Sequence, residues 1–369
     1  MTYASPQEVG FCPHFDTFNW PVPHDRQRIT VEGHVISFDP SKPIYVTRGL
    51  TGRCTSVFTA STRDDVTGRD RTCVLKLSYQ PSRRIISEID HYRLLAEKGI
   101  EGVPEILCAQ KLSSLGDGPR GALMKCLPHY VFGPIRYLEA IVMADKYKPI
   151  TSIDINKDTK LFFRIFLSIV ETHHRAYVEA GILHRDIHTN NLMWGIEDGR
   201  PVGVLIDWDF ASGPVSHPPE DPQQSAFTLN VAFLAVDLLQ KECSSRFYRH
   251  DLESFFWVLW SIIISKVGIV DLDKFAMVSR WEQGNVGHRK FSKFAFLDRG
   301  QHDVLETLQM SKQTSLSHAG VTECLSALGD MISRGQNVLE RRTQKTNVET
   351  ADGHIVYTNF VAALKRAVE

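Results

Sequence analysis

The amino-acid sequence predicts an α+β fold in which an antiparallel sheet with one helix precedes a mainly α-helical part. Three short apolar runs near the start have the composition and spacing of β-strands: Ile44–Thr47, Ser56–Ala60 and Thr72–Leu77. Apolar residues then recur at helical spacing over Arg83–Lys98, and Gly99 ends the pattern. After Asp145 the helical periods are longer, as in Leu161–Glu179. These observations predict a β-rich part followed by an α-rich part.

Further strands and one central helix follow from the same patterns. The polar stretch Ser61–Arg71 separates two of the strands and predicts a hairpin loop. Four later runs are also expected to be strands: Pro104–Ala109, Ala122–Leu127, Tyr137–Met143 and Val202–Ile206. The apolar run Phe255–Ile264 is much shorter than the roughly 20 residues that cross a bilayer, so it predicts a buried helix.

These patterns divide the chain into three stretches. Residues 1–43 are rich in Pro, His and Phe without a clear period, which favours an irregular N-terminal extension with a short strand at Ile36–Asp39. Residues 44–145 form the β-rich part, and residues 146–369 form the α-rich part. The proline-rich segment Gly213–Gln224 is predicted to be a flexible loop within the α-rich part.

The composition excludes several classes of protein. The chain has 369 residues, a formal net charge of -1, 43% hydrophobic residues and 23% charged residues. These values are typical of a soluble globular protein and give no overall attraction to nucleic acid or to an anionic membrane. The seven cysteines are scattered without a C-x-x-C pair, which argues against a disulfide framework or a zinc site and favours a reducing compartment. Because no basic segment followed by an apolar run begins the chain, we expect an intracellular protein, cytoplasmic or nuclear.

One ordered set of polar residues carries the strongest functional signal. The segment His184–Asp186 is followed by Asn191, five residues after the aspartate, and then by Asp207 directly after an expected strand. This order and spacing resemble the catalytic loop and the metal-binding aspartate of protein kinases. Phosphoryl transfer moves negative charge that Mg²⁺ neutralises, and Mg²⁺ prefers carboxylate and amide oxygens, so Asn191 and Asp207 are the predicted metal ligands. Asp186 is the predicted base for the attacking hydroxyl, and the neighbouring Arg185 is a further candidate catalytic residue.

The same residues have plainer interpretations. Asp and Asn in a turn often hydrogen-bond only their own backbone, although the complete ordered set favours catalysis. His184 and His188 alternate with Asp186 and could suggest zinc, but such a pair without a cysteine or a third histidine is more often structural.

The kinase pattern also requires an ATP-binding lysine on an earlier strand and a glutamate on the helix that follows. Lys76 lies among apolar residues of the third run, where an unpaired ammonium would be costly. Glu88 on the next helix is the expected partner, and Glu97 is the weaker choice. Alternatively, Lys76 is an edge-strand lysine whose ammonium reaches solvent. The downstream motif favours the ion pair, so Lys76 and Glu88 are candidate cofactor-binding residues.

The loop that covers the phosphates of ATP is predicted at Gly49–Val57. Backbone N–H groups at Gly52 could approach a phosphate there, because glycine has no side chain in the way. Only the middle glycine of the G-x-G-x-x-G-x-V pattern is kept, with Leu50 and Thr55 at the outer positions. A simple surface turn would have nearly the same sequence.

At a finer level the chain resembles the fungal-type protein kinase-like family. Five segments carry this resemblance: Gly52–Thr55, Gly181–Ile187, Leu205–Asp209, Phe233–Leu239 and His250–Leu259. The similar region runs from about residue 45 to about residue 265 and leaves residues 1–43 outside. The resemblance implies a two-lobed protein-kinase-like fold that binds ATP and Mg²⁺, with a Ser or Thr hydroxyl of a protein as the acceptor.

The resemblance also implies roles for single residues. Backbone groups from Met143 to Asp145 would pair with adenine. Asp237 takes the place of the acidic residue that closes the activation segment. Asp251 would cap the central helix and hydrogen-bond the backbone of the catalytic loop, although an aspartate there is also an ordinary helix N-cap.

Two departures from ordinary protein kinases keep other functions open. Asp209 replaces the glycine of D-F-G, and His188 replaces the lysine that commonly follows the catalytic aspartate by two residues. The alternative enzyme is therefore a small-molecule phosphotransferase of the aminoglycoside or choline kinase type. A non-catalytic pseudokinase is the third hypothesis, because the glycine loop is degraded. Arg185 favours a protein kinase, since it could pair with a phosphate on the flexible loop. Four hydroxyls could receive that phosphate: Ser212, Ser216, Ser225 and Thr228.

Overall fold

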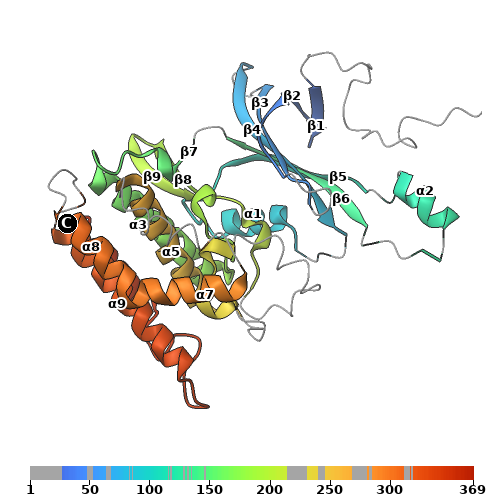
Figure 1. Ribbon diagram of the computed structural model, residues 1–369. Coiled ribbons are helices and arrows are strands. Elements are labelled where there is room, and N and C mark those ends of the chain that lie inside the picture. The colour runs from blue at the N-terminus through green and yellow to red at the C-terminus, as the bar shows by residue number, and fades with distance from the viewer. Residues whose placement is uncertain are drawn as a thin grey trace, which may run out of the picture. The chain divides into compact units, whose positions relative to one another are not determined.

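The structure is a computed structural model that describes residues 27–47, 53–63, 68–82, 84, 86–114, 116, 119–127, 129–130, 133, 135–144, 147–213, 231–239, 246–267, 281, 285–310, 316 and 319–369. It has an α+β fold with an antiparallel sheet in the N-terminal part and a helical C-terminal part, as the sequence predicts (Figure 1). The chain splits into two compact units. The first comprises Met1–Arg93 and Pro104–Lys146, and the second comprises Leu94–Val103 and Tyr147–Glu369.

The first unit is built on a six-stranded antiparallel sheet in the order β1-β2-β3-β4-β6-β5. Its strands are β1 Gln27–Val31, β2 His34–Val46, β3 Ser56–Arg63, β4 Asp70–Pro81, β5 Ile106–Ser114 and β6 Arg136–Ala144. Its described helices are α2 Pro119–Cys126 and the first part of α1 Glu88–Glu97, whose residues from Leu94 on belong to the second unit. The hairpin expected between the second and third runs is confirmed as the β3–β4 pair.

Side chains alternate between the two faces of β4, because successive residues of a strand point to opposite sides. Cys73, Leu75 and Leu77 belong to the hydrophobic core on one face. Lys76 and Ser78 lie on the other face and are also buried. The sheet therefore encloses buried polar groups on the side opposite its apolar core.

Three sequence expectations for the first unit are wrong. Residues 27–43 are not irregular but form β1 and most of β2, and the short strand expected at Ile36–Asp39 is confirmed within β2. The signal that could have shown this is the two-residue turn Glu32–Gly33, whose φ angles of 48° and 85° suit a tight hairpin. The helix expected over Arg83–Lys98 begins only at Glu88. The run Ala122–Leu127, expected as a strand, falls largely within helix α2, whose sequence contains the good helix formers Ala, Leu, Met and Lys.

The second unit is mainly helical. Its α-helices are α3 Thr159–Ala180, α5 Tyr248–Val267, α7 Val286–Ala295, α8 Gln301–Met310, α9 Ala319–Glu340 and α10 Tyr357–Lys365, with a π-helical turn at Phe296–Gly300. A small sheet pairs β7 Lys148–Pro149, β8 Leu192–Glu197 and β9 Arg200–Leu205 in that order. Short 3₁₀ turns include Thr189–Asn191, Trp208–Phe210, Val231–Phe233 and Val236–Leu239.

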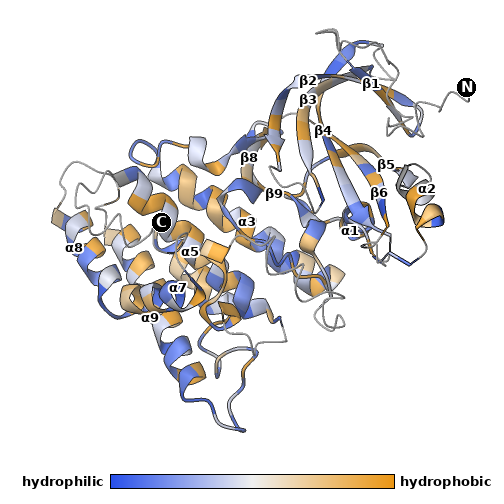
Figure 2. Cartoon of the chain, turned by 45° about the vertical axis from the view of Figure 1, so that its right-hand side comes forward, coloured by the Kyte–Doolittle hydropathy of each residue, from blue (hydrophilic) through white to orange (hydrophobic). Residues whose placement is uncertain are grey.

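The core of the second unit forms around α3 and α5, where the hydrophobic colour is concentrated in Figure 2. The helix expected at Phe255–Ile264 is confirmed, and nearly all of its side chains are fully buried. Phe255 contacts Phe166 of α3 edge to face, with the ring centroids 5.9 Å apart. Burial of each such side chain stabilises the fold by about 1.5–3 kcal/mol, so α5 is a rigid support for the polar residues that it carries.

Among the helices that the structure describes, none combines the length and the apolar character that crossing a membrane requires.

Candidate active site

In the first unit, Lys76 and Glu88 form a buried ion pair. The Lys76 Nζ atom donates to both carboxylate oxygens of Glu88, at 2.8 and 2.7 Å, and the side chains are 6% and 0% exposed. Lys76 therefore does not reach solvent as an edge-strand lysine would. A buried pair loses the solvation of both charges, so removing one partner leaves a costly unpaired charge.

The start of α1 places Glu88 for this pair. Ser87 precedes the helix, and its backbone N–H and hydroxyl both donate to the Asp90 carboxylate, at 2.8 and 2.7 Å. The Asp90 N–H in turn points to the Ser87 hydroxyl oxygen at 3.4 Å. This reciprocal arrangement is a capping box in which Ser87 is the N-cap residue and Asp90 is the third residue of the helix. It explains why the helix begins at Glu88 rather than at Arg83.

A second carboxyl group lies close to this pair in the sheet. Lys76 is opposite Ile141 and Ser78 is opposite Glu139, so Glu139 is a diagonal neighbour of Lys76 on the same face. Glu139 is 0% exposed, and neither of its carboxylate oxygens has a hydrogen-bond partner among the described residues. Burial, followed by the negative charge of Glu88, raises the pKa of Glu139 to about 7. No pattern in the sequence distinguished this residue.

In the second unit, the predicted catalytic loop, His184–Asn191, follows the end of α3. Gly181 closes α3 in the left-handed conformation, with φ 69°, which glycine adopts without strain. Leu183 then exchanges two backbone hydrogen bonds with Ser212, at 2.9 and 3.1 Å. These two hydrogen bonds hold Leu183 beside Ser212, and Asp186 lies in the segment between these two residues.

His184 organises the interior of this loop. Its Nδ1 accepts a hydrogen bond from the Asp186 N–H at 3.3 Å, and its Nε2 donates to the Ile206 carbonyl at 2.9 Å. Burial lowers the pKa of His184, which suits a neutral ring that accepts at one nitrogen and donates at the other. Both ring nitrogens are engaged within the protein, so the structure favours the structural interpretation of His184 over zinc binding.

Hydrogen bonds link the segments of the second unit that contain Asp186, Asn191 and Asp207. The Asn191 Nδ2 donates to the Asp186 carbonyl at 2.9 Å, and the Ile206 N–H donates to the Asn191 carbonyl at 3.0 Å. Asp207 follows Ile206 directly, and β9 ends one residue earlier, at Leu205. Arg185 and Asp207 both have positive φ angles, 70° and 64°, which is uncommon for residues with a side chain. Such conformations concentrate at functional sites, where the surrounding structure enforces them.

The first turn of α5 supports this loop. Asp251 is buried, and its Oδ2 accepts from the Arg185 N–H at 3.0 Å and from His173 Nε2 at 2.8 Å. Burial alone would raise the pKa of Asp251, but the hydrogen bond and charge of His173 lower it to about 2. The contact with the catalytic-loop backbone is the one that the resemblance implied. His173 of α3 is an additional positioning residue that sequence reasoning missed.

Two further side chains stand beside Asp186. The His188 Nε2 atom lies 3.6 Å from the Asp186 carboxylate, and its Nδ1 accepts from the Asn190 N–H at 3.3 Å. The Arg185 guanidinium donates to the Ser212 hydroxyl. Ser216, Ser225 and Thr228, the other candidate phosphate acceptors, lie outside the described residues.

The remaining predicted site residues are placed only in part. Met143 lies in β6, opposite Val74 of β4. Gly52 and Asp145 lie outside the described residues, as does most of the proline-rich segment after Gly213. Lys76, Glu88 and Met143 belong to the first unit, while Asp186, Asn191 and Asp207 belong to the second.

The α+β fold is compatible with a kinase-like phosphotransferase, and comparison with known proteins supports this class. A family model described as fungal protein kinase matches residues 1–117 and 133–263, which is more than half of the chain. The chain belongs to the fungal protein kinase family. The match includes residues 1–43, so the expectation that they lie outside the similar region is wrong. No curated protein sequence matches the chain.

Proposed function

We propose that this chain is a two-lobed, ATP- and Mg²⁺-dependent protein kinase that transfers the γ-phosphate of ATP to a Ser or Thr hydroxyl of a protein. The observation that carries the proposal is the set of hydrogen bonds that links the segments of Asp186, Asn191 and Asp207. Membership of the fungal protein kinase family supports the same class of reaction. The lobes correspond in this proposal to the two compact units, and β1 and β2 add residues 27–43 to the first lobe, which the sequence predicted at residues 44–145.

Asp186 acts as the catalytic base. Its carboxylate accepts the proton of the acceptor hydroxyl while the hydroxyl oxygen forms a bond to the γ-phosphorus and the bond from that phosphorus to the bridging oxygen of ADP breaks. The loop around Asp186 is held by His184, Asn191 and Asp251, so the carboxylate keeps its orientation during the reaction. Arg185 contributes by its backbone contact with Asp251 and by its side chain, which faces Ser212.

Asn191 and Asp207 suit a magnesium site by their chemistry. The Asn191 Nδ2 is used by the Asp186 carbonyl, which leaves the amide Oδ1 as the atom that can serve as a ligand. Asp207 adds a carboxylate directly after Ile206, whose N–H donates to the Asn191 carbonyl. Bound Mg²⁺ would neutralise charge on the transferred phosphoryl group.

ATP binding is assigned to residues of the first unit. Lys76, whose Nζ donates to both carboxylate oxygens of Glu88, is the residue that contacts the phosphates. Gly52 supplies backbone N–H groups to the phosphates, and backbone groups from Met143 to Asp145 pair with adenine.

A small-molecule phosphotransferase is the second candidate, and the contact between His188 and Asp186 favours it. Ordinary protein kinases keep a lysine at this position, whereas here an imidazole lies 3.6 Å from the catalytic carboxylate. A different group beside the base implies a different way of handling the acceptor.

Transfer of labelled phosphate from ATP distinguishes these candidates. The purified chain is incubated with labelled ATP and Mg²⁺, with dephosphorylated casein or a peptide array in one arm and a panel of hydroxylated metabolites in the other. We expect label on Ser or Thr of protein, loss of transfer when Mg²⁺ is chelated, and a higher Mg²⁺ requirement in Asn191→Ala. Label on metabolites alone would favour the second candidate, and no label in either arm would contradict both.

A further inference from the structure

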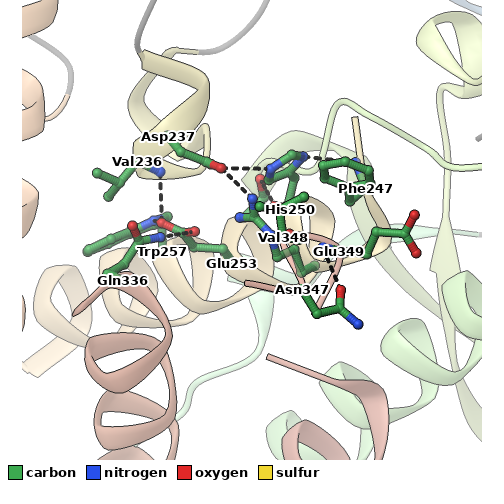
Figure 3. Close-up of polar contacts among 12 residues, drawn as sticks. Val236, Asp237, Phe247, His250, Glu253, Trp257, Gln336, Asn347, Val348 and Glu349 are labelled. Atoms are coloured by element: carbon green, nitrogen blue, oxygen red, sulfur yellow. Dashed lines mark hydrogen bonds and ion pairs between the residues drawn. The ribbon is translucent and has the colours of Figure 1, made fainter. Parts of the chain in front are cut away.

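Residues 234–237 of the second unit are held by buried ionisable side chains from neighbouring helices, and Figure 3 shows the contacts of Val236 and Asp237. Glu253 of α5 accepts a hydrogen bond from the Val236 N–H at 2.8 Å. Lys293 of α7 donates to the carbonyl of Leu234. Both side chains are 0% exposed, so two fully buried groups of opposite charge bind the backbone of one short segment.

The Glu253 carboxylate has a complete set of donors. Besides Val236, it accepts from the Trp257 Nε1–H at 3.1 Å and from the Gln336 Nε2–H of α9 at 2.7 Å. Figure 3 shows these side chains converging on Glu253 from α5 and α9. Three donors are the environment that an ionised carboxylate needs once it has left water.

Lys293 supplies the balancing positive charge. Its Nζ lies 4.6 Å from the centroid of the Trp257 ring, whose π-face attracts a cation. Burial raises the pKa of Glu253 and lowers that of Lys293, while the charge of each opposes the shift of the other. The two charges therefore depend on each other, and the loss of one leaves the other buried without compensation.

The start of α5 also binds Asp237, the last residue of this segment, and the backbone of the catalytic loop. Arg249 and His250 both donate to the Asp237 carboxylate, the histidine at 3.1 Å. Asp251, between His250 and Glu253 in the sequence, binds the backbone N–H of Arg185. One turn of a buried helix thus ties residues 234–237 and the catalytic loop to a common support.

We propose that Glu253 and Lys293 are positioning residues that fix residues 234–237 relative to the catalytic loop and thereby place the acceptor hydroxyl for Asp186. The inference rests on the phosphotransfer activity proposed above. Asp186 receives the acceptor, and it shares the α5 support with residues 234–237. The residues assigned to ATP lie in the other unit, so disturbing this support changes acceptor use more than ATP use.

Amide hydrogen exchange of the full chain tests the anchoring without any need for activity. The variants are Glu253→Gln, Lys293→Met and the double variant, and the control is Lys290→Met. Lys290 lies on the same helix as Lys293 and pairs with Glu340 near the surface at 3.0 Å. We expect exchange over residues 231–239 to rise about tenfold in each single variant, because a charge-assisted hydrogen bond is lost or weakened, and to match the parent in Lys290→Met.

The double variant keeps the test decisive if a single variant does not fold. It buries neither charge, so its effect on exchange is smaller than the product of the two single effects. Its exchange still exceeds that of the parent, because the Leu234 carbonyl has lost its donor. Exchange equal to that of the parent in every folded variant overturns the anchoring.

Kinetics with casein and MgATP test the second half of the proposal. We expect kcat/KM for casein to fall about tenfold in Glu253→Gln, while KM for ATP stays within about twofold of the parent. An equal fall in kcat/KM for casein and for ATP would mean a general structural role and would overturn the positioning role. If the parent transfers no phosphate, the proposed function fails, and the exchange result still decides whether Glu253 and Lys293 anchor the segment.

Discussion

Replacing Glu139 by glutamine should make the chain more stable, and increasingly so as the pH rises. Glu139 is fully buried in β6, and both of its carboxylate oxygens lack a hydrogen-bond partner among the described residues. Burial and then the charge of Glu88 raise its pKa from the ordinary 4.5 to about 7. The folded protein therefore holds the proton of Glu139 over a pH range in which the unfolded chain has released it.

The size and sign of the effect follow from this difference in pKa. Stability that depends on the protonated carboxyl is fully present below about pH 4.5 and is lost as the pH rises through about 7, and the total loss is about 3 kcal/mol. Glutamine has a similar shape and cannot ionise, so it avoids this loss. We expect Glu139→Gln to exceed the parent in unfolding free energy by about 1 kcal/mol at about pH 5.5 and by about 3 kcal/mol at about pH 8.5.

Urea unfolding of the full chain at both pH values measures this gain. The matched control is Glu97→Gln, which makes the same chemical change on the exposed surface of α1. The control should differ from the parent by less than about 0.5 kcal/mol at either pH. A gain in Glu139→Gln that stays the same at both pH values would refute the reasoning, because it would mean that the carboxyl does not ionise between them.

Three further predictions concern the candidate site. Lys76→Met should lower the unfolding free energy by about 3–5 kcal/mol in urea unfolding, because Glu88 is left as a buried unpaired charge, and Lys76→Met/Glu88→Leu should recover much of this loss. A double variant no more stable than Lys76→Met would contradict the ion-pair account. Asp251→Asn should cost about 2 kcal/mol at neutral pH, since the pKa of Asp251 is lowered to about 2 and its stabilisation is lost only as the pH falls toward that value. An unchanged midpoint of urea unfolding at neutral pH would argue against it. Phosphopeptide mapping of the active chain should find phosphate on Ser212, whose hydroxyl faces Arg185, and phosphatase treatment should lower the activity of the parent more than that of Arg185→Ala. Equal sensitivity of both proteins to phosphatase would count against a pairing between Arg185 and the phosphate.

The sequence predicted the parts of the fold and site that depend on short-range patterns. The sequence predicts the buried helix at Phe255–Ile264 because its apolar residues form one continuous run. It predicts the order of Asp186, Asn191 and Asp207 because the three lie close together in the chain. The partner of Lys76 was predictable because only one glutamate lies early on the following helix.

The parts that the sequence did not predict depend on contacts between distant segments. A single buried polar residue has no period that marks it, as with Glu139 in an apolar stretch and His173 among polar neighbours. Glu253 lies beside an apolar run and resembles an ordinary helix residue until Val236 and Gln336 are seen to donate to it. The turn at Glu32–Gly33 was missed because only the glycine carries a strong turn signal, whereas Glu32 also takes a positive φ in the structure.

The rate of phosphate transfer in Asp186→Ala, compared with the parent and with Asp298→Ala, tests the central claim most directly. Asp298 is an exposed aspartate of the same unit, and its substitution controls for the loss of a carboxylate. With MgATP and casein, we expect Asp186→Ala to be at least about 100-fold slower than the parent and Asp298→Ala to match it, because only Asp186 acts where the proton leaves the acceptor. Equal rates in Asp186→Ala and the parent would contradict the assignment of the catalytic loop.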